Sequence, residues 1–215
     1  MRKMLHYALV LTVINGIAGI GLYGVNELTR DRIAAAQRRN LVEGQQQLLP
    51  EATVFSEAKT FDMHGRPVTY YEAQDAGGAI IGYELDYAVQ GYQSPVRVLS
   101  AIGRDGTLRG IKVLSQAETP GLGAEVQAIP SDKTLWRALA DIVRRAPPAT
   151  TAVVAIPPFQ AQFAGKTTNA LVVVKTKDPD RIEALSGATI TSDAVTRAVR
   201  EPVVAFLAFL EQQSN

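Results

Sequence analysis

The sequence predicts an α+β fold in which one N-terminal transmembrane helix precedes a domain of mixed antiparallel strands and helices. Three observations support this prediction. A long run without charged side chains opens the chain, and an amphipathic helical pattern closes it. Between them, short apolar segments separated by turn signals indicate strands. These strands and helices do not alternate regularly, as they would in a parallel α/β protein.

The N-terminal run covers residues 4–26, which contain no Asp, Glu, Lys or Arg. A helix of about 23 residues spans roughly 35 Å, enough to cross a hydrocarbon core of about 30 Å. A cleaved signal peptide and a buried helix are the alternatives. The run is longer than the usual apolar core of a signal peptide, and no small-x-small cleavage site closes it cleanly. We therefore predict an uncleaved membrane anchor.

The residues after the anchor predict a helix and then four strands. Residues 27–49 are rich in good helix formers, and Pro50 ends this helix. The apolar segments that predict strands cover residues 68–73, 80–89, 96–102 and 108–114. The sequence Asp-Gly between the last two segments predicts a hairpin.

The C-terminal part predicts two helices and one strand. Residues 131–145 form a helical pattern, and residues 171–175 form an apolar strand. The final helix is predicted to begin near Thr191 and Ser192, and Pro202 is expected to kink or restart it. We divide the chain into a tip with the anchor (1–28), a membrane-proximal helix with strands (29–90) and the main domain (91–215).

The composition excludes several kinds of site. The chain has no cysteine, which excludes Cys-ligated zinc, iron–sulfur clusters and thiol catalysis within it. His6 and His64 are isolated from other metal ligands. Residues 1–40 contain six basic and two acidic side chains, so the remainder is mildly acidic, with a net charge of −3. Such a domain lacks the basic surface that nucleic-acid binding requires.

A turn of small residues before the final helix is the strongest functional signal. Residues 186–192 have the sequence Ser-Gly-Ala-Thr-Ile-Thr-Ser and lead into the apolar helix. Small residues allow close approach to the backbone, and the positive end of the helix dipole favours a phosphate. A turn with an ordinary N-cap is the alternative, because Ser and Thr favour such positions.

Two motifs resemble those of a known family. The turn resembles the flavinylation motif of FMN-binding domains, in which a transferase joins FMN through its phosphate to the last Thr of Ser-Gly-Ala-Thr, here Thr189. Residues 118–123, Glu-Thr-Pro-Gly-Leu-Gly, resemble the signature of the G subunit of the Rnf electron-transport complex. The motifs occur in the expected order, about 65 residues apart, and the resemblance covers most of the chain.

The resemblance implies a covalent FMN site built from three segments. Thr189 would carry the phosphate ester, and backbone N–H groups with the hydroxyls of Thr191 and Ser192 would bind its oxygens. The remaining residues of the turn would shape it: Ser186, Gly187 and Ala188. Lys166, in a segment that resembles Gln-Phe-x-Gly-Lys, would neutralise the phosphate or the reduced ring. The second motif would lie against the flavin ring through Glu118, Thr119, Gly121, Leu122 and Gly123.

For several of these residues a purely structural role is the alternative. The second motif forms a rigid turn on either interpretation, since Pro fixes φ and Gly permits positive φ. Glu118 could be a solvated acid, and Lys166 could be an exposed lysine without a role. The chain also departs from the family pattern, because Glu183 stands where Asp is usual and Ala124-Glu125 where Asp-Lys is common.

The resemblance further implies an electron-transfer subunit of a membrane-bound, ion-translocating ferredoxin:NAD oxidoreductase. Such a protein is not expected to be catalytic alone, and its partners would be other membrane and redox subunits and a flavin transferase. The family implies a cytoplasmic N-terminus and a domain on the periplasmic side of the bacterial inner membrane. The basic residues after the anchor argue weakly for the opposite orientation.

Two other functions stand as alternatives. The C subunit of the Na⁺-translocating NADH:quinone reductase shares the flavinylation motif and the anchor, but the second motif and the chain length favour the Rnf protein. A cofactor-free membrane-anchored scaffold or binding module would be colourless, with a normal Thr189→Ala variant. Direct NAD binding is not expected, because the Gly-x-Gly-x-x-Gly pattern at residues 19–24 lies inside the apolar run.

Overall fold

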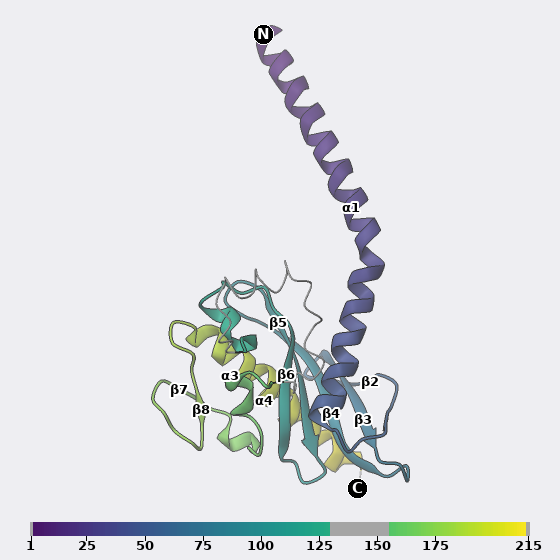
Figure 1. The fold of residues 1–215 in the computed structure, drawn as a ribbon, viewed down its shortest axis with the longest axis vertical. Coiled ribbons are helices and arrows are strands. Elements are labelled where there is room, and N and C mark those ends of the chain that lie inside the picture. Colours follow the sequence, from purple (N-terminus) through teal and green to yellow (C-terminus); the bar gives the residue numbers. More distant parts are fainter. Residues whose placement is uncertain (1, 130–154, 214–215) are drawn as a thin grey trace, which may run out of the picture. The chain divides into compact units, whose positions relative to one another are not determined.

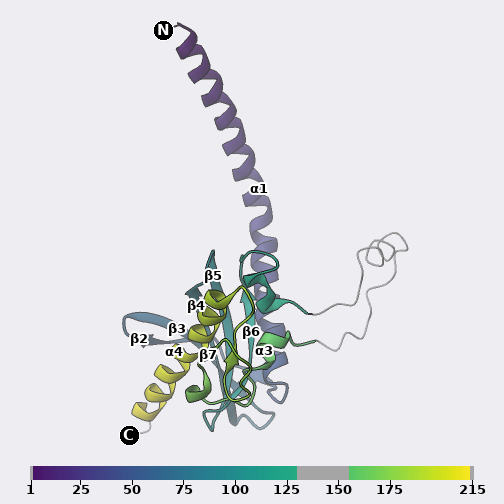
Figure 2. The ribbon, with the colours of Figure 1, turned by 90° about the vertical axis from the view of Figure 1, so that its left-hand side faces the viewer.

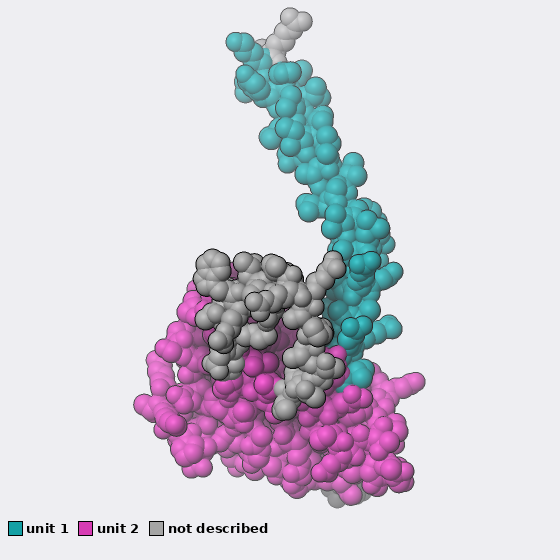
Figure 3. Space-filling model, viewed as in Figure 1, with its two compact units in different colours: residues 1–42 teal, residues 43–215 magenta. Residues whose placement is uncertain are grey.

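The computed structural model describes residues 2–129 and 155–213. Two compact units divide the chain, residues 1–42 and residues 43–215, which Figure 3 colours separately. The helix predicted over residues 131–145 lies outside the described residues.

One continuous helix, α1 (Arg2–Leu48), contains both the predicted anchor and the helix predicted after it. In the first unit its apolar side chains are exposed; Ile20 and Leu22 keep about three quarters of their surface, at 75% and 73%. By length and composition this helix can cross a membrane. Its exposed apolar surface is suited to lipid, and the predicted membrane anchor agrees with this. The helix ends two residues before Pro50, because a residue that precedes proline avoids the helical conformation.

An antiparallel sheet of six strands forms the centre of the second unit (Figure 1). The strand order is β1-β3-β4-β5-β6, and β2 also pairs with β3. The strands are β1 (Val54–Phe55), β2 (Lys59–Met63), β3 (Arg66–Gln74), β4 (Ile80–Gln90), β5 (Pro95–Gly103) and β6 (Leu108–Ser115). The predicted segments 29–90 and 91–215 both contribute strands to this one sheet, with β4 hydrogen-bonded to β5 along its length.

The four predicted strands are confirmed as β3 to β6, and the Asp-Gly hairpin joins β5 to β6. Two strands of this sheet, β1 and β2, were not predicted. β2 pairs with β3 through a tight turn in which His64 has a φ of 54° and Gly65 a φ of 81°. Two consecutive positive φ angles are typical of a type I′ hairpin turn, whose usual signal is Asn-Gly or Asp-Gly. His-Gly gives a much weaker signal, so this hairpin was not predicted from the sequence.

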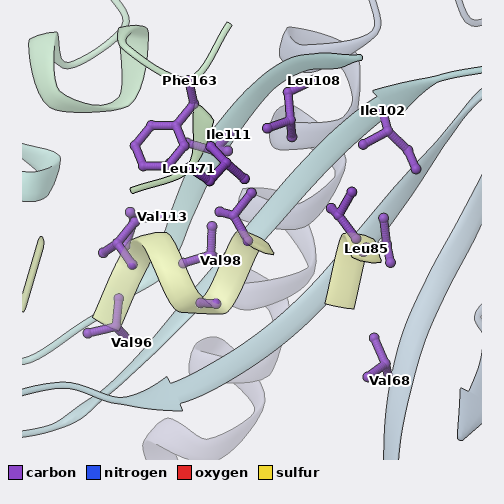
Figure 4. Close-up of a cluster of buried hydrophobic side chains, with 14 of the residues drawn as sticks. Val68, Leu85, Val96, Val98, Ile102, Leu108, Ile111, Val113, Phe163 and Leu171 are labelled. Atoms are coloured by element: carbon purple, nitrogen blue, oxygen red, sulfur yellow. The ribbon is translucent and has the colours of Figure 1, made fainter. Parts of the chain in front are cut away.

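The C-terminal helix α4 (Thr189–Gln213) covers one face of this sheet (Figure 2). Val195, Val199, Val203 and Phe206 are fully buried, as their helical spacing predicts. The helix begins two residues earlier than predicted and continues through Pro202 without a restart. Figure 4 shows side chains of neighbouring strands gathered where α4 crosses them, including Leu85, Val98 and Val113.

Short elements connect the sheet to α4. They are η1 (Gly123–Gln127), α3 (Pro158–Ala161), η2 (Thr168–Ala170), β7 (Val173–Val174) and β8 (Ile182–Glu183). β7 and β8 pair in parallel, so the strand predicted over residues 171–175 is shorter than expected and is not antiparallel. The loop after β6 and the turn after β8 both end beside the first turn of α4, and these two segments build the candidate site.

The opposite face of the sheet is covered by the last turns of α1, which belong to the second unit. A Cβ atom placed on Gly82 of β4 would lie 3.4 Å from Leu49, and one on Gly110 of β6 would lie 3.0 Å from Leu48. Leu48 and Leu49 are buried. The end of α1, which lies in the helix predicted over residues 27–49, is therefore part of the folded domain.

Candidate functional site

A cavity of about 390 Å³ opens at the N-terminal end of α4. It falls in the size range of pockets that bind small molecules and cofactors. The structure brings together residues of both sequence motifs here. The cavity is lined by Tyr92, Glu118, Thr119, Leu122, Gly123, Gly187, Ala188, Thr189, Ile190 and Thr191.

The first turn of α4 presents donors without partners toward this cavity. The first helical hydrogen bond runs from the Ser192 N–H to the Ala188 carbonyl, at 2.9 Å. In the described parts of the chain, the N–H groups of Thr189, Ile190 and Thr191 make no hydrogen bond. Free N–H groups at a helix start attract anions, because they add to the positive end of the helix dipole. The side chain of Thr189 is exposed beside them.

Gly187 sets the path of the chain into this helix. Its φ of 74° favours glycine. A Cβ atom there would also lie 3.0 Å from the Leu122 side chain, so the turn and the second motif approach each other closely. The Ala188 N–H donates to the Leu185 carbonyl at 3.0 Å and closes the turn. The glycine of the first motif is thus required by its conformation and by its neighbour.

The hydroxyls of Thr191 and Ser192 are already engaged inside the protein. Ser192 Oγ donates to the Ala188 carbonyl at 3.0 Å and accepts from the Leu185 N–H at 3.0 Å. Thr191 Oγ1 donates to Glu118 Oε2 at 2.8 Å. Both residues are buried. Their hydroxyls hold the turn together, which leaves the backbone N–H groups as the donors available to a phosphate.

The carboxylate of Glu118 joins three segments at the back of the cavity. Oε1 accepts hydrogen bonds from the N–H groups of Gln93 and Ser94, each at 3.0 Å, and Oε2 accepts the bond from Thr191. Burial raises the pKa of Glu118, but the bonds from Ser94, Thr191 and Gln93 outweigh it, so this pKa lies below its ordinary value. Glu118 is therefore a buried, ionised link between the loops.

Two glycines allow the loops to close on this carboxylate. A Cβ atom on Gly91 would lie 2.7 Å from Glu118 Oε1, and one on Gly123 would lie 2.8 Å from Oε2 and 2.6 Å from Thr191 Oγ1. These distances are too short for any larger residue without movement of the loops. The final glycine of the second motif is explained by this contact with the first motif.

Exposed apolar side chains form the rim of the cavity. Tyr92, Ile190 and Leu122 are exposed by 69%, 56% and 45%. Apolar walls with a few polar groups behind them suit a flat aromatic ligand. Thr119 supplies a hydroxyl, although its hydrogen already goes to Gln93 Oε1 at 2.9 Å. Tyr92 and Ile190 were not among the predicted site residues, because nothing in the sequence marked either side chain as a cofactor contact.

Four predicted site residues do not line the cavity. Ser186 and Gly121 lie outside it, and Gly121 has a φ of 77° that shapes the loop. Ser192 is buried, and its hydroxyl stabilises the turn from inside the protein. Lys166 Nζ donates to the Pro179 carbonyl at 2.6 Å, so this ammonium stabilises a separate loop. Within the described residues, no group of acidic, His or Cys side chains could hold a metal ion.

Comparison with known proteins places this cavity in a family context. The model of the FMN-binding domain matches residues 91–203, which include both motifs. The G subunit of the ion-translocating oxidoreductase complex of Methanosarcina acetivorans is 27% identical over 206 residues, covering 94% of each chain. The G subunit of the Na⁺-translocating ferredoxin:NAD⁺ oxidoreductase complex of Acetobacterium woodii is 29% identical, covering 89% of this chain and 86% of that protein.

A solved structure has a similar fold. The crystal structure of the C subunit of the Na⁺-translocating NADH-quinone reductase from Parabacteroides distasonis superimposes with a TM-score of 0.52. The similarity covers 83% of this chain and 96% of that one, at 19% sequence identity. At this identity the likeness concerns the fold.

Proposed function

Because this chain belongs to the FMN-binding domain family, we propose that it is the G subunit of an ion-translocating ferredoxin:NAD oxidoreductase (Rnf) complex and that it carries FMN covalently on Thr189. The G subunits of Methanosarcina acetivorans and Acetobacterium woodii match it over 94% and 89% of its length. In this role the chain is a redox subunit of a larger enzyme, and bound FMN supplies the capacity to accept and release electrons.

The single observation that carries the covalent linkage is the position of Thr189. Its side chain is exposed at the edge of the cavity, next to three N–H groups without partners among the described residues. Linkage would join Thr189 Oγ to the FMN phosphorus with the net loss of one water. The N–H groups of Thr189, Ile190 and Thr191 would then hold the negative oxygens of the phosphate ester.

The remaining cavity residues support a flavin ring beside this phosphate. Tyr92, Leu122 and Ile190 offer apolar surface to a planar ring, and Thr119 with nearby backbone groups offers hydrogen bonds to its polar edges. The main role of Glu118 would be structural, because its hydrogen bonds fix the loops that bear these residues. A covalent phosphate would keep the flavin at a site that is open to solvent.

We further propose that α1 anchors the chain with its N-terminus in the cytoplasm and the domain on the periplasmic side of the bacterial inner membrane. The exposed apolar run of α1 supports anchoring. Other membrane and redox subunits of the complex would be its partners, and a flavin transferase would modify Thr189. Lys166 is a less favoured candidate for neutralising the cofactor, because its ammonium is bound to Pro179.

Intact mass and peptide mapping of the full-length protein test the linkage. From a host with a flavin transferase, we expect the mass of one FMN less one water on the peptide that holds Thr189. Thr189→Ala should remove the adduct, whereas Ser186→Ala should keep it, because Ser186 is exposed in the same turn but does not line the cavity. An unmodified and colourless wild-type protein from that host would instead support a cofactor-free scaffold.

A further inference from the structure

A buried carboxylic acid lies on the sheet face opposite α4, outside the cofactor cavity. Glu84 is on β4, between Tyr83 and Leu85, which face α4. Because side chains alternate along a strand, Glu84 points to the other face. Its exposed fraction is 0%, and neither of its carboxyl oxygens has a hydrogen-bond partner among the described residues. An ionised carboxylate without partners is costly in such a place.

The last turns of α1 cover this acid. Leu48 and Leu49 pack over Gly110 and Gly82, and Gly82 lies two residues before Glu84 on the same strand face. Gln45, one turn earlier, is also buried, and its amide nitrogen has no partner in the described residues either. The Gln45 amide is the polar group that lowers the pKa of Glu84, although its nitrogen and the Glu84 oxygens do not complete a hydrogen bond.

No cation on the surrounding described elements compensates a negative charge on Glu84. The ionisable groups on the sheet face that α1 covers are Tyr71 on β3, Asp86 on β4, Arg97 on β5, and Lys112 and Arg109 on β6, with Glu43 on α1 and Glu51 just after it. Arg97 Nε donates to Asp86 at 2.8 Å, and Arg109 pairs with Asp105 at 3.2 Å, so both guanidinium groups are already paired.

Lys112 and Tyr71 do not compensate it either. The charge that acts on Lys112 is that of Glu43, which opposes the lowering of the Lys112 pKa by burial. Burial raises the pKa of Tyr71, which carries no positive charge in either form. Burial likewise raises the pKa of Glu84, to about 8, while the Gln45 amide acts weakly in the other direction. Glu84 is thus a neutral acid at neutral pH, because desolvation outweighs the one polar neighbour.

We propose that Glu84 is a proton-binding site and that its protonated form holds the last turns of α1, residues 43–49, on the sheet. A protonated carboxyl can donate to the Gln45 carbonyl oxygen and accept from the Gln45 amide nitrogen, which satisfies the atoms that lack partners. An ionised carboxyl has no hydrogen to donate and keeps its charge in an apolar place. Release of the helix end would let water reach the carboxylate.

The direction of the pH effect follows from this difference. When the helix end is released, the Glu84 pKa returns toward its ordinary value of 4.5, whereas in the docked state it is about 8. The docked state therefore holds more protons between these values, and docking weakens as pH rises from about 4.5 to about 8. Above this window both states are ionised, and pH has no further effect. At neutral pH each release of the helix end would free one proton.

Hydrogen exchange on the full-length protein in lipid nanodiscs tests this proposal. The opening equilibrium of residues 43–49, corrected for intrinsic exchange with peptides of β5, should rise about tenfold per pH unit between about pH 5.5 and 7 and level off above about pH 8. Glu84→Gln should remove this dependence, since Gln cannot ionise. Glu57→Gln, at an exposed acid between β1 and β2, should behave as wild type. Equal pH slopes in wild type and Glu84→Gln would overturn the proposal.

Infrared spectroscopy gives a second, independent readout that needs only the wild-type protein and one variant. A neutral carboxylic acid band that titrates near pH 8 is expected. In Glu84→Gln this band should be absent, which assigns it to the Glu84 carboxyl. A wild-type protein without a titrating acid band above pH 6 would show Glu84 already ionised and would refute the proposal. Neither result depends on bound flavin.

Discussion

At the scale of single residues, one carboxylate organises the candidate site. The sequence identified Glu118 as part of a motif but left two roles open, a contact with the ligand or a solvated acid without a role. The structure shows it buried, with its oxygens bound to Gln93, Ser94 and Thr191. These partners lie 25, 24 and 73 residues away along the chain. No local pattern reports such distant hydrogen bonds, so the motif was predictable and its physical role was not.

Replacing Glu118 with Gln should weaken the link between the loops. A Gln side chain keeps the size but turns one acceptor into an NH₂ group, which then faces an N–H donor or the Thr191 hydroxyl. We expect the free energy of unfolding at pH 7 to fall by about 1–3 kcal/mol. Urea unfolding would measure this, with Glu125→Gln, at an exposed acid of η1, as the matched control.

The pH dependence of the difference in unfolding free energy between wild type and Glu118→Gln distinguishes the effect of the carboxylate charge from that of side-chain shape. Because the folded state lowers the pKa of Glu118, its ionised form stabilises the protein above the ordinary pKa of 4.5. This contribution is lost as pH falls through the lower pKa of the folded state. The gap between wild type and Glu118→Gln should therefore shrink in acid. A gap that stays constant down to about pH 3 would indicate that the carboxylate charge contributes nothing.

At the scale of elements, regular patterns were read correctly and irregular contacts were not. The alternating strands β3 to β6 and the buried stripe of α4 follow directly from side-chain periodicity. The hairpin between β2 and β3 was missed because His64 occupies a positive φ that Asn or Asp normally marks. The motif loop after β6 was recognised as a loop, but its packing against α4 depends on Gly123, whose neighbour Thr191 is remote in sequence.

The packing of this loop predicts different effects for two of its glycines. Gly123→Ala would place a Cβ atom 2.6 Å from Thr191 Oγ1, so the loop must move away from α4. Gly121→Ala has open space but a φ of 77°, so it costs only backbone strain of about 1 kcal/mol. We expect Gly123→Ala to lose more stability, about 1–3 kcal/mol, in thermal unfolding. Equal losses would mean that crowding at Gly123 relaxes freely.

At the scale of the whole molecule, the sequence distinguished an apolar N-terminal helix from a mixed α+β domain, and the structure confirms both. It did not reveal what the C-terminal end of this helix packs against. Leu48 and Leu49 were assigned to a membrane-proximal helix, because the helical pattern is continuous from the anchor onward. The structure instead buries them on the sheet, and the second compact unit starts at Glu43. Helical periodicity reports which side chains share a face, and it does not report what that face contacts.

This boundary makes a prediction for truncated chains. A fragment of residues 43–215 keeps Leu48 and Leu49 on the sheet and should be soluble and folded. A fragment of residues 51–215 exposes the sheet face around Glu84 and should lose about 3–6 kcal/mol, since full burial of each of the two leucines contributes about 1.5–3 kcal/mol. Urea unfolding and size-exclusion chromatography of the two fragments would measure this. Equal stability of the two fragments would show that the last turns of α1 pack on the sheet without stabilising it. The shorter fragment should also lose the pH-dependent exchange proposed above, because it lacks Gln45 and the helix end that Glu84 holds.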